Sequence, residues 1–152
     1  MLRLCFYSPR IPGNTGSAIR LSACTGAHLH LVDPLFDMDD AKLRRAGLDY
    51  HDLAHVEVND SIDDVYALAA PGRIFVFTGQ ASTHHTDIAY REGDLLVFGP
   101  EPTGLPQEMI DDPRVTPVRL PMRPGARSLN LSNAAAIALY EAWRQLDFAG
   151  GV

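Results

Sequence analysis

The sequence has no long apolar run, no tract of like charges and only two cysteines among its 152 residues. No run approaches the ~20 apolar residues that span a bilayer, and the N-terminus lacks the basic and apolar regions of an export signal. Cys5 and Cys24 show neither a disulfide framework nor zinc-ligand spacing, so we expect reduced thiols packed in the core. These absences predict a cytoplasmic protein with no membrane partner.

Length and composition predict a single domain over residues 1–152, because 46% of the residues are hydrophobic and can form one buried core. A net charge of -6 counts against a general nucleic-acid binder, since the phosphate backbone attracts positive surface. Local arginine clusters could still bind RNA phosphates, or they could be ordinary solvated side chains. The largest cluster consists of Arg114, Arg119, Arg123 and Arg127.

Short apolar runs alternate with helical patterns along the chain. We expect strands at residues 2–7, 28–32, 73–77 and 94–98, with a weaker one at 115–120, and helices at 16–25, 40–46, 61–70, 106–111 and 132–146. This alternation predicts an α/β fold with a mainly parallel open sheet and helices on both faces. The ligand site of such a sheet lies beyond the carboxyl ends of its strands.

The last predicted helix is apolar nearly all the way round over residues 133–140. One face can pack on the sheet of its own domain, so the second apolar face predicts contact with another copy of the chain, in a homodimer through this C-terminal helix. Trp143 could extend that face, and Tyr140 could lie either there or near the site. The alternative is a helix buried deep within its own fold.

Three polar segments follow predicted strands. Residues 9–20 combine glycines with Arg10 and Arg20, and could approach a phosphate at a helix N-terminus. Residues 95–106 carry two glycines, three prolines and the carboxylate of Glu101, a composition typical of a rigid loop shaped for a ligand. Residues 120–133 offer more hydroxyl and amide groups than a helix cap at Asn130 or Ser132 requires.

These segments resemble the motifs of the SPOUT methyltransferases. The resemblance rests on three stretches in the same order as in that family, namely Asn14-Thr15-Gly16 to Arg20, Phe98-Gly99-Pro100-Glu101 to Gly104-Leu105, and Ser128-Leu129-Asn130-Leu131-Ser132-Asn133-Ala134. Within the family, residues 43–50 and 140–145 resemble the minimal members that methylate the ribose 2'-hydroxyl of a wobble cytidine or uridine in tRNA. Pro102 and Thr103 depart from the family pattern in the second motif.

The resemblance implies a C-terminal trefoil knot, S-adenosylmethionine as cofactor without a metal, and the tRNA anticodon stem-loop as partner. It implies cofactor contacts, largely through backbone atoms, at Phe77, Thr78, Gly99, Leu120, Met122, Ser128, Leu129 and Asn130. It also implies that Arg20 activates the 2'-hydroxyl. Because a guanidinium is essentially never deprotonated in a protein, we expect Arg20 to hold a phosphate and stabilise the developing oxyanion. The side chains expected to order the site around Arg20 are those of Asn14, Glu101, Ser128 and Asn130.

Two rival functions remain at the level of sequence. A Rossmann-type nucleotide-binding oxidoreductase is suggested by the strand and helix alternation, by the loop from Gly13 to Gly16 and by Asp33, although the glycine spacing does not match the dinucleotide fingerprint. A non-catalytic RNA-binding module is the other. The histidine pairs, His51 with His55 and His84 with His85, have no clear third metal ligand nearby, so we expect surface or loop histidines.

Overall fold

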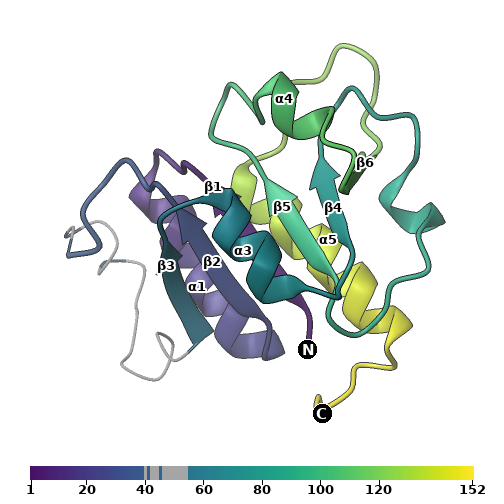
Figure 1. Cartoon of the computed structure of the whole chain (residues 1–152), viewed down its shortest axis with the longest axis horizontal. Coiled ribbons are helices and arrows are strands. Elements are labelled where there is room, and N and C mark those ends of the chain that lie inside the picture. The colour runs from purple at the N-terminus through teal and green to yellow at the C-terminus, as the bar shows by residue number, and fades with distance from the viewer. Residues whose placement is uncertain (40, 42–44, 46–54) are drawn as a thin grey trace.

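The computed structural model describes residues 1–39, 41, 45 and 55–152. Its strands form one parallel sheet in the order β3-β2-β1-β5-β4-β6 (Figure 1). The bounds of the strands are β1 Arg3–Tyr7, β2 His28–Val32, β3 Val56–Asn59, β4 Ile74–Phe77, β5 Leu95–Phe98 and β6 Val115–Val118. The chain order reverses between β1 and β5, so a ligand site is expected beyond the carboxyl ends of these two strands.

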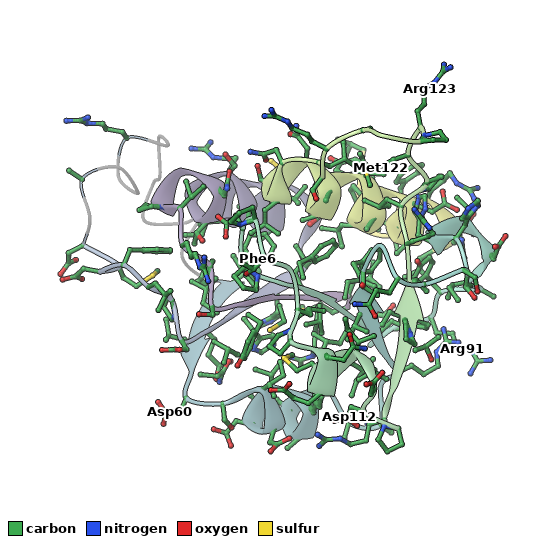
Figure 2. All side chains as sticks on the ribbon, turned by 90° about the horizontal axis from the view of Figure 1, so that it is seen from above. Phe6, Asp60, Arg91, Asp112, Met122 and Arg123 are labelled. Carbon is green, nitrogen blue, oxygen red and sulfur yellow. The ribbon has the colours of Figure 1, made fainter. Side chains whose placement is uncertain are left out.

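Helices cover both faces of the sheet, as the sequence predicted. The long helices α1 (Pro12–Thr25) and α5 (Leu131–Gln145) lie side by side on one face, and Phe6 lies between them and the sheet (Figure 2). The short helices α3 (Ile62–Ala69) and α4 (Gln107–Ile110) pack on the other face. Each face therefore has its own apolar core, and the predicted fold class is confirmed.

The observed elements match most of the predicted ones. Strand β3 was missed because Val56-Glu57-Val58-Asn59 is short, alternates polar with apolar residues and lies at the edge of the sheet, where burial is incomplete. Helix α1 begins at Pro12 rather than Gly16, since proline is well tolerated in the first turn of a helix. Most of the helix predicted at residues 40–46 lies outside the described residues.

Helix α5 has one buried face and one exposed face. Asn130 caps it, accepting hydrogen bonds from the backbone N–H groups of Ser132 and Asn133 at 3.0 and 3.2 Å. Its buried face consists of Leu131, Ala135, Ala138, Leu139 and Ala142. The large apolar side chains of Ile137 and Tyr140 are 45% and 44% exposed on the other side. The second apolar face that the sequence predicted is thus present and open within one chain.

The two cysteines differ in their surroundings. Cys5 is buried in strand β1, and burial raises the pKa of its thiol, as core packing implies. Cys24 is exposed, so its prediction as a core residue was wrong; it lies on the outer side of α1 with Ser17 and Arg20. Among the described residues, no helix combines the length and the apolar character needed to cross a membrane.

Candidate active site

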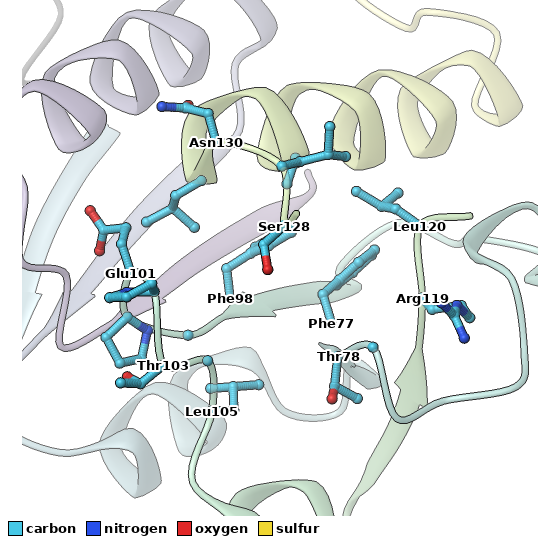
Figure 3. A pocket seen from close by; sticks show the side chains of 18 of the residues that line it. Phe77, Thr78, Phe98, Glu101, Thr103, Leu105, Arg119, Leu120, Ser128 and Asn130 are labelled. Carbon is cyan, nitrogen blue, oxygen red and sulfur yellow. The ribbon is translucent and has the colours of Figure 1, made fainter. Parts of the chain in front are cut away.

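Loops from the carboxyl ends of four strands enclose a pocket of about 530 Å³. Parallel strands place these ends at one edge of the sheet, so segments far apart in the sequence meet there. Glu101 and Asn130 lie on one side of the pocket and Leu120 and Arg119 on the other, with Phe77 and Phe98 between them (Figure 3). The size is typical of a site for a small molecule of nucleoside dimensions.

A chain of hydrogen bonds fixes the polar side of the pocket. The carboxylate of Glu101 accepts from the backbone N–H groups of Arg10 and Ile11, both at 3.1 Å, and from Asn14 Nδ2 at 2.9 Å. Asn14 Oδ1 in turn accepts from Asn130 Nδ2 at 2.9 Å. Asn14 is only 8% exposed, so little water competes for these bonds. The loops after β1 and β5 and the start of α5 are thereby held in one arrangement.

The inner part of the pocket is apolar and tightly built. The rings of Phe77 and Phe98 stack with centroids 4.5 Å apart and planes 16° apart. Gly99 follows directly, and a Cβ there would collide with the backbone of Gly104 and Leu105, so only glycine permits this close approach. Leu105 and Ile110 complete the inner wall. An apolar inner wall with a fixed carboxylate at the rim suits a ligand that is partly hydrophobic and partly cationic.

The loop that follows β6 forms the outer wall. Every residue from 121 to 130 is exposed, although Met122, Ser128 and Leu129 line the pocket. Arg123 projects from this loop into solvent, whereas Asp60 and Asp112 lie on the opposite, α3 side of the molecule (Figure 2). The outer wall therefore offers backbone groups and a positive side chain to whatever approaches the pocket, despite the net charge of -6.

The structure brings together nearly all the residues that the sequence singled out. The pocket lining includes the predicted cofactor contacts Phe77, Thr78, Gly99, Leu120, Met122, Ser128 and Leu129, and also Asn14, Glu101 and Asn130. Arg20 is not in this lining. It is exposed on the outer side of α1, away from the buried face that carries Asn14, because the two residues are six positions apart on one helix.

Several lining residues were missed by sequence reasoning. Gln80, Ile110 and Arg119 line the pocket without having been assigned to the site, whereas Phe98 and Leu105 were noted only as members of the second motif. Ile110 looks like an ordinary core residue in the sequence, so no local signal distinguishes it. Arg119 directly precedes the predicted contact Leu120, which was the available hint. Neighbours of a predicted backbone contact are reasonable candidates for the same pocket.

The residues that suggested rival functions lie outside the pocket lining or in a different kind of structure from the one expected. Gly13 and Gly16 lie within helix α1 rather than in a glycine-rich loop, and Asp33 is exposed and outside the pocket lining. His84 is exposed, as predicted, but His85 is buried in the 3-10 turn η2 (His85–Asp87), where burial lowers the pKa of its imidazole. His51 lies outside the described residues. Within the described part of the chain, no cluster of metal-ligating side chains occurs.

Comparison with known proteins identifies full-length relatives. A model of the SpoU rRNA Methylase family matches residues 1–140. A tRNA (cytidine(34)-2'-O)-methyltransferase of Methylovorus glucosotrophus is 53% identical over 156 residues, covering 100% of both chains. The protein of the same name in Escherichia coli K12 is 45% identical over 154 residues, covering 100% of this chain and 98% of its own.

Solved structures agree with this relationship. A structure concerned with 2-OH methylation of C/U34 on tRNA superposes with a TM-score of 0.88 at 40% identity, covering 97% of this chain and 91% of that one. The SpoU methyltransferase AviRb of Streptomyces viridochromogenes, in complex with the cofactor AdoMet, gives a TM-score of 0.81 at 29% identity and covers 97% of this chain and 61% of its own. By sequence over its whole length and by fold, the chain belongs to the SpoU rRNA methylase family.

Proposed function

We propose that this protein transfers a methyl group from S-adenosylmethionine to the ribose 2'-hydroxyl of the wobble cytidine or uridine, position 34, of tRNA. The observation that carries the proposal is the pocket itself, in which the segments resembling the three motifs of the family meet around Glu101 and Asn130. Relatives named tRNA (cytidine(34)-2'-O)-methyltransferase match the chain from end to end, which supports the choice of tRNA and of this nucleotide. Such an enzyme would work in the cytoplasm.

The pocket fits the cofactor in size and charge. The Phe77 and Phe98 rings provide an apolar wall for a nucleoside, and the fixed carboxylate of Glu101 offers a negative charge to a cationic group. Bound S-adenosylmethionine supplies an electrophilic methyl group on a sulfonium. The exposed backbone of the loop that contains Ser128 and Leu129 would hold it from the outer side, through the contacts that the family resemblance implies.

The reaction needs alignment and removal of one proton. A bond would form between the ribose 2'-oxygen and the methyl carbon as the carbon–sulfur bond breaks, and the 2'-hydroxyl proton would pass to solvent water, giving 2'-O-methyl RNA and S-adenosylhomocysteine. In this proposal Asn14, Glu101, Ser128 and Asn130 keep the reacting groups in line. Arg20 holds a phosphate beside the reacting ribose and stabilises the negative charge that develops on its oxygen.

A homodimer would explain the position of Arg20. The outer sides of α1 and α5 carry Arg20 with Ile137 and Tyr140, and all three side chains are exposed. A second copy seated on this apolar surface would bury the C-terminal helix of each chain and bring arginines of both copies around one RNA. We further propose that α5 reaches this position by passing through a trefoil knot, as the family resemblance implies.

The test is methyl transfer from radiolabelled S-adenosylmethionine to unfractionated tRNA, followed by digestion and identification of the labelled nucleoside. We expect 2'-O-methylcytidine or a 2'-O-methyluridine from position 34. Arg20→Ala should abolish labelling and Arg20→Lys should lower it strongly, because lysine keeps the charge but not the planar fork. Arg91→Ala is the matched control, since Arg91 is exposed and lies before the amino end of β5, whereas the pocket lies beyond the carboxyl ends of the strands.

Other outcomes separate the rival functions. Cofactor binding without any labelled nucleoside would move the substrate away from position 34. RNA binding without cofactor binding would favour a non-catalytic module, and nicotinamide binding in place of S-adenosylmethionine would favour an oxidoreductase. Full turnover by Arg20→Lys would refute the bidentate role proposed for this arginine.

A further inference from the structure

The pocket has a second bridge between its walls, on the side away from Glu101. Strands β4 and β5 pair only as far as Val76 and Val97, and the loops that follow them separate to form two walls. Gln80, on the loop after β4, donates from Nε2 to Oε1 of Gln107, the first residue of α4, at 3.0 Å. This contact joins the two walls beyond the point where the sheet stops holding them together.

Both ends of the bridge are anchored. Gln107 Nε2 donates to Asp111 Oδ1 at 3.1 Å, which fixes the orientation of the Gln107 amide. On the other wall, the backbone N–H of Gln80 donates to Thr78 Oγ1 at 3.2 Å, and the N–H of Thr78 donates to the carbonyl of Val118 at 2.9 Å. An amide held at both ends restricts the distance between the walls better than a freely rotating side chain would.

The segments that the bridge joins contact the interior of the pocket. Gln80 itself lines the pocket next to Thr78, while Leu105 and Ile110 line it on either side of Gln107. A change in the spacing between the β4 loop and α4 therefore changes the width of the cavity. The polar network of Glu101 cannot compensate, because it joins the β5 loop to α1 and α5 and makes no bond to the β4 loop.

We propose that Gln80 and Gln107 are positioning residues that hold the pocket closed around S-adenosylmethionine and slow the release of S-adenosylhomocysteine. The inference rests on the proposed function, because it takes this pocket as the cofactor site. An exposed hydrogen bond between neutral groups contributes modestly, so its loss should weaken cofactor binding by about two- to tenfold. The chemical step at saturating cofactor should be unaffected, since neither side chain needs to contact the reacting atoms.

The experiment measures S-adenosylhomocysteine affinity by calorimetry and its dissociation rate by stopped flow. Gln80→Ala and Gln107→Ala should each weaken affinity and speed dissociation, and the double variant should be no worse than either single one, because both remove the same bond. Single-turnover methyl transfer at saturating S-adenosylmethionine should stay at the wild-type rate. Glu108→Ala is the control, as Glu108 is the exposed neighbour of Gln107 on α4.

Two further results decide the interpretation. Asp111→Asn retains an acceptor oxygen for Gln107 and should bind like the wild type. If Gln80→Ala weakens binding while Gln107→Ala does not, Gln80 contacts the cofactor directly and the bridge is refuted; equal affinity in all variants refutes any role. Failure of the wild type to bind S-adenosylhomocysteine at all would instead overturn the proposed function, so the two failures are distinguishable.

Discussion

Asn14 joins two loops of the pocket, and its removal should affect stability and activity together. Asn14→Ala deletes a hydrogen bond to the carboxylate of Glu101 and another from the amide of Asn130, both 2.9 Å long. A bond to a charged group contributes about 1.5–3 kcal/mol and a neutral one about 1 kcal/mol. We therefore expect the free energy of unfolding to fall by about 2–4 kcal/mol, because Asn14 is 8% exposed and water replaces the lost partners poorly.

The same variant should lose activity for a geometric reason. Without Asn14, Glu101 keeps two backbone donors but no longer fixes the start of α5. A displacement of the Ser128–Asn130 loop by a fraction of an ångström to an ångström should lower kcat/KM by about 10- to 100-fold. Urea denaturation measures the first effect and tRNA methylation the second. A stability loss below about 0.5 kcal/mol, with full activity, would show that the network is not structural.

A second variant separates the network from helix capping. Asn130→Ser keeps a side chain that can cap α5 but is too short to reach Asn14 Oδ1, so it should lower the free energy of unfolding by only about 1 kcal/mol while lowering activity as Asn14→Ala does. Ser61→Ala is the matched control, because Ser61 caps α3 at a distance from the pocket. It should cost a similar amount of stability, about 1 kcal/mol, and leave methylation unchanged.

The remaining predictions concern pH, a buried carboxylate and salt. Burial, and then the nearby Arg3, lower the pKa of His30 below 6.5, so the unfolded chain binds a proton more readily than the folded one. The free energy of unfolding, measured by urea denaturation, should therefore be highest above pH 6.5 and fall as the pH drops below it. The fall should be less steep in His30→Gln. Asp94 is 1% exposed and accepts two hydrogen bonds from Arg73, at 3.0 and 2.7 Å. Asp94→Ala should lower the free energy of unfolding by about 2–4 kcal/mol, whereas Asp63→Ala, at an exposed ion pair, should lower it by less than about 1 kcal/mol. Affinity for tRNA should fall by about 10- to 100-fold between about 50 and about 200 mM salt in filter binding, and a flat response would refute an arginine-based RNA surface.

The fold could be predicted from the sequence because the strands at its centre carry an unambiguous pattern. Strands β4 and β5 are continuous apolar runs, and β1 is one from Leu4 onward, as expected of strands buried on both faces. Strand β3 could not be predicted in this way, since its edge position leaves Glu57 and Val58 exposed and removes the apolar run. The strand order is also beyond local patterns, because pairing of β1 with β5 depends on contacts about 90 residues apart.

Whether a residue of the candidate site could be predicted from the sequence depends on what its side chain does in the structure. Glu101, Asn14 and Asn130 could be found because each lies in one of the three segments that resemble the family's motifs, and the structure joins them by hydrogen bonds. Ile110 could not, because burying an apolar side chain in a pocket wall leaves the same sequence signal as burying it in the core.

Arg20 represents a third kind of residue, one whose proposed role depends on a second copy of the chain. Its side chain is exposed on α1 and outside the pocket lining, and in our proposal α1 of one copy approaches the pocket of another. This requirement can be tested by mixing Arg20→Ala with Glu101→Ala, each inactive alone in the proposed mechanism. If the pocket of one copy uses the arginine of its partner, a mixed dimer contains one intact site and recovers up to about a quarter of wild-type activity at random mixing, as two-fold symmetry implies. If each copy uses its own arginine, that same dimer carries one defect in each site and stays inactive.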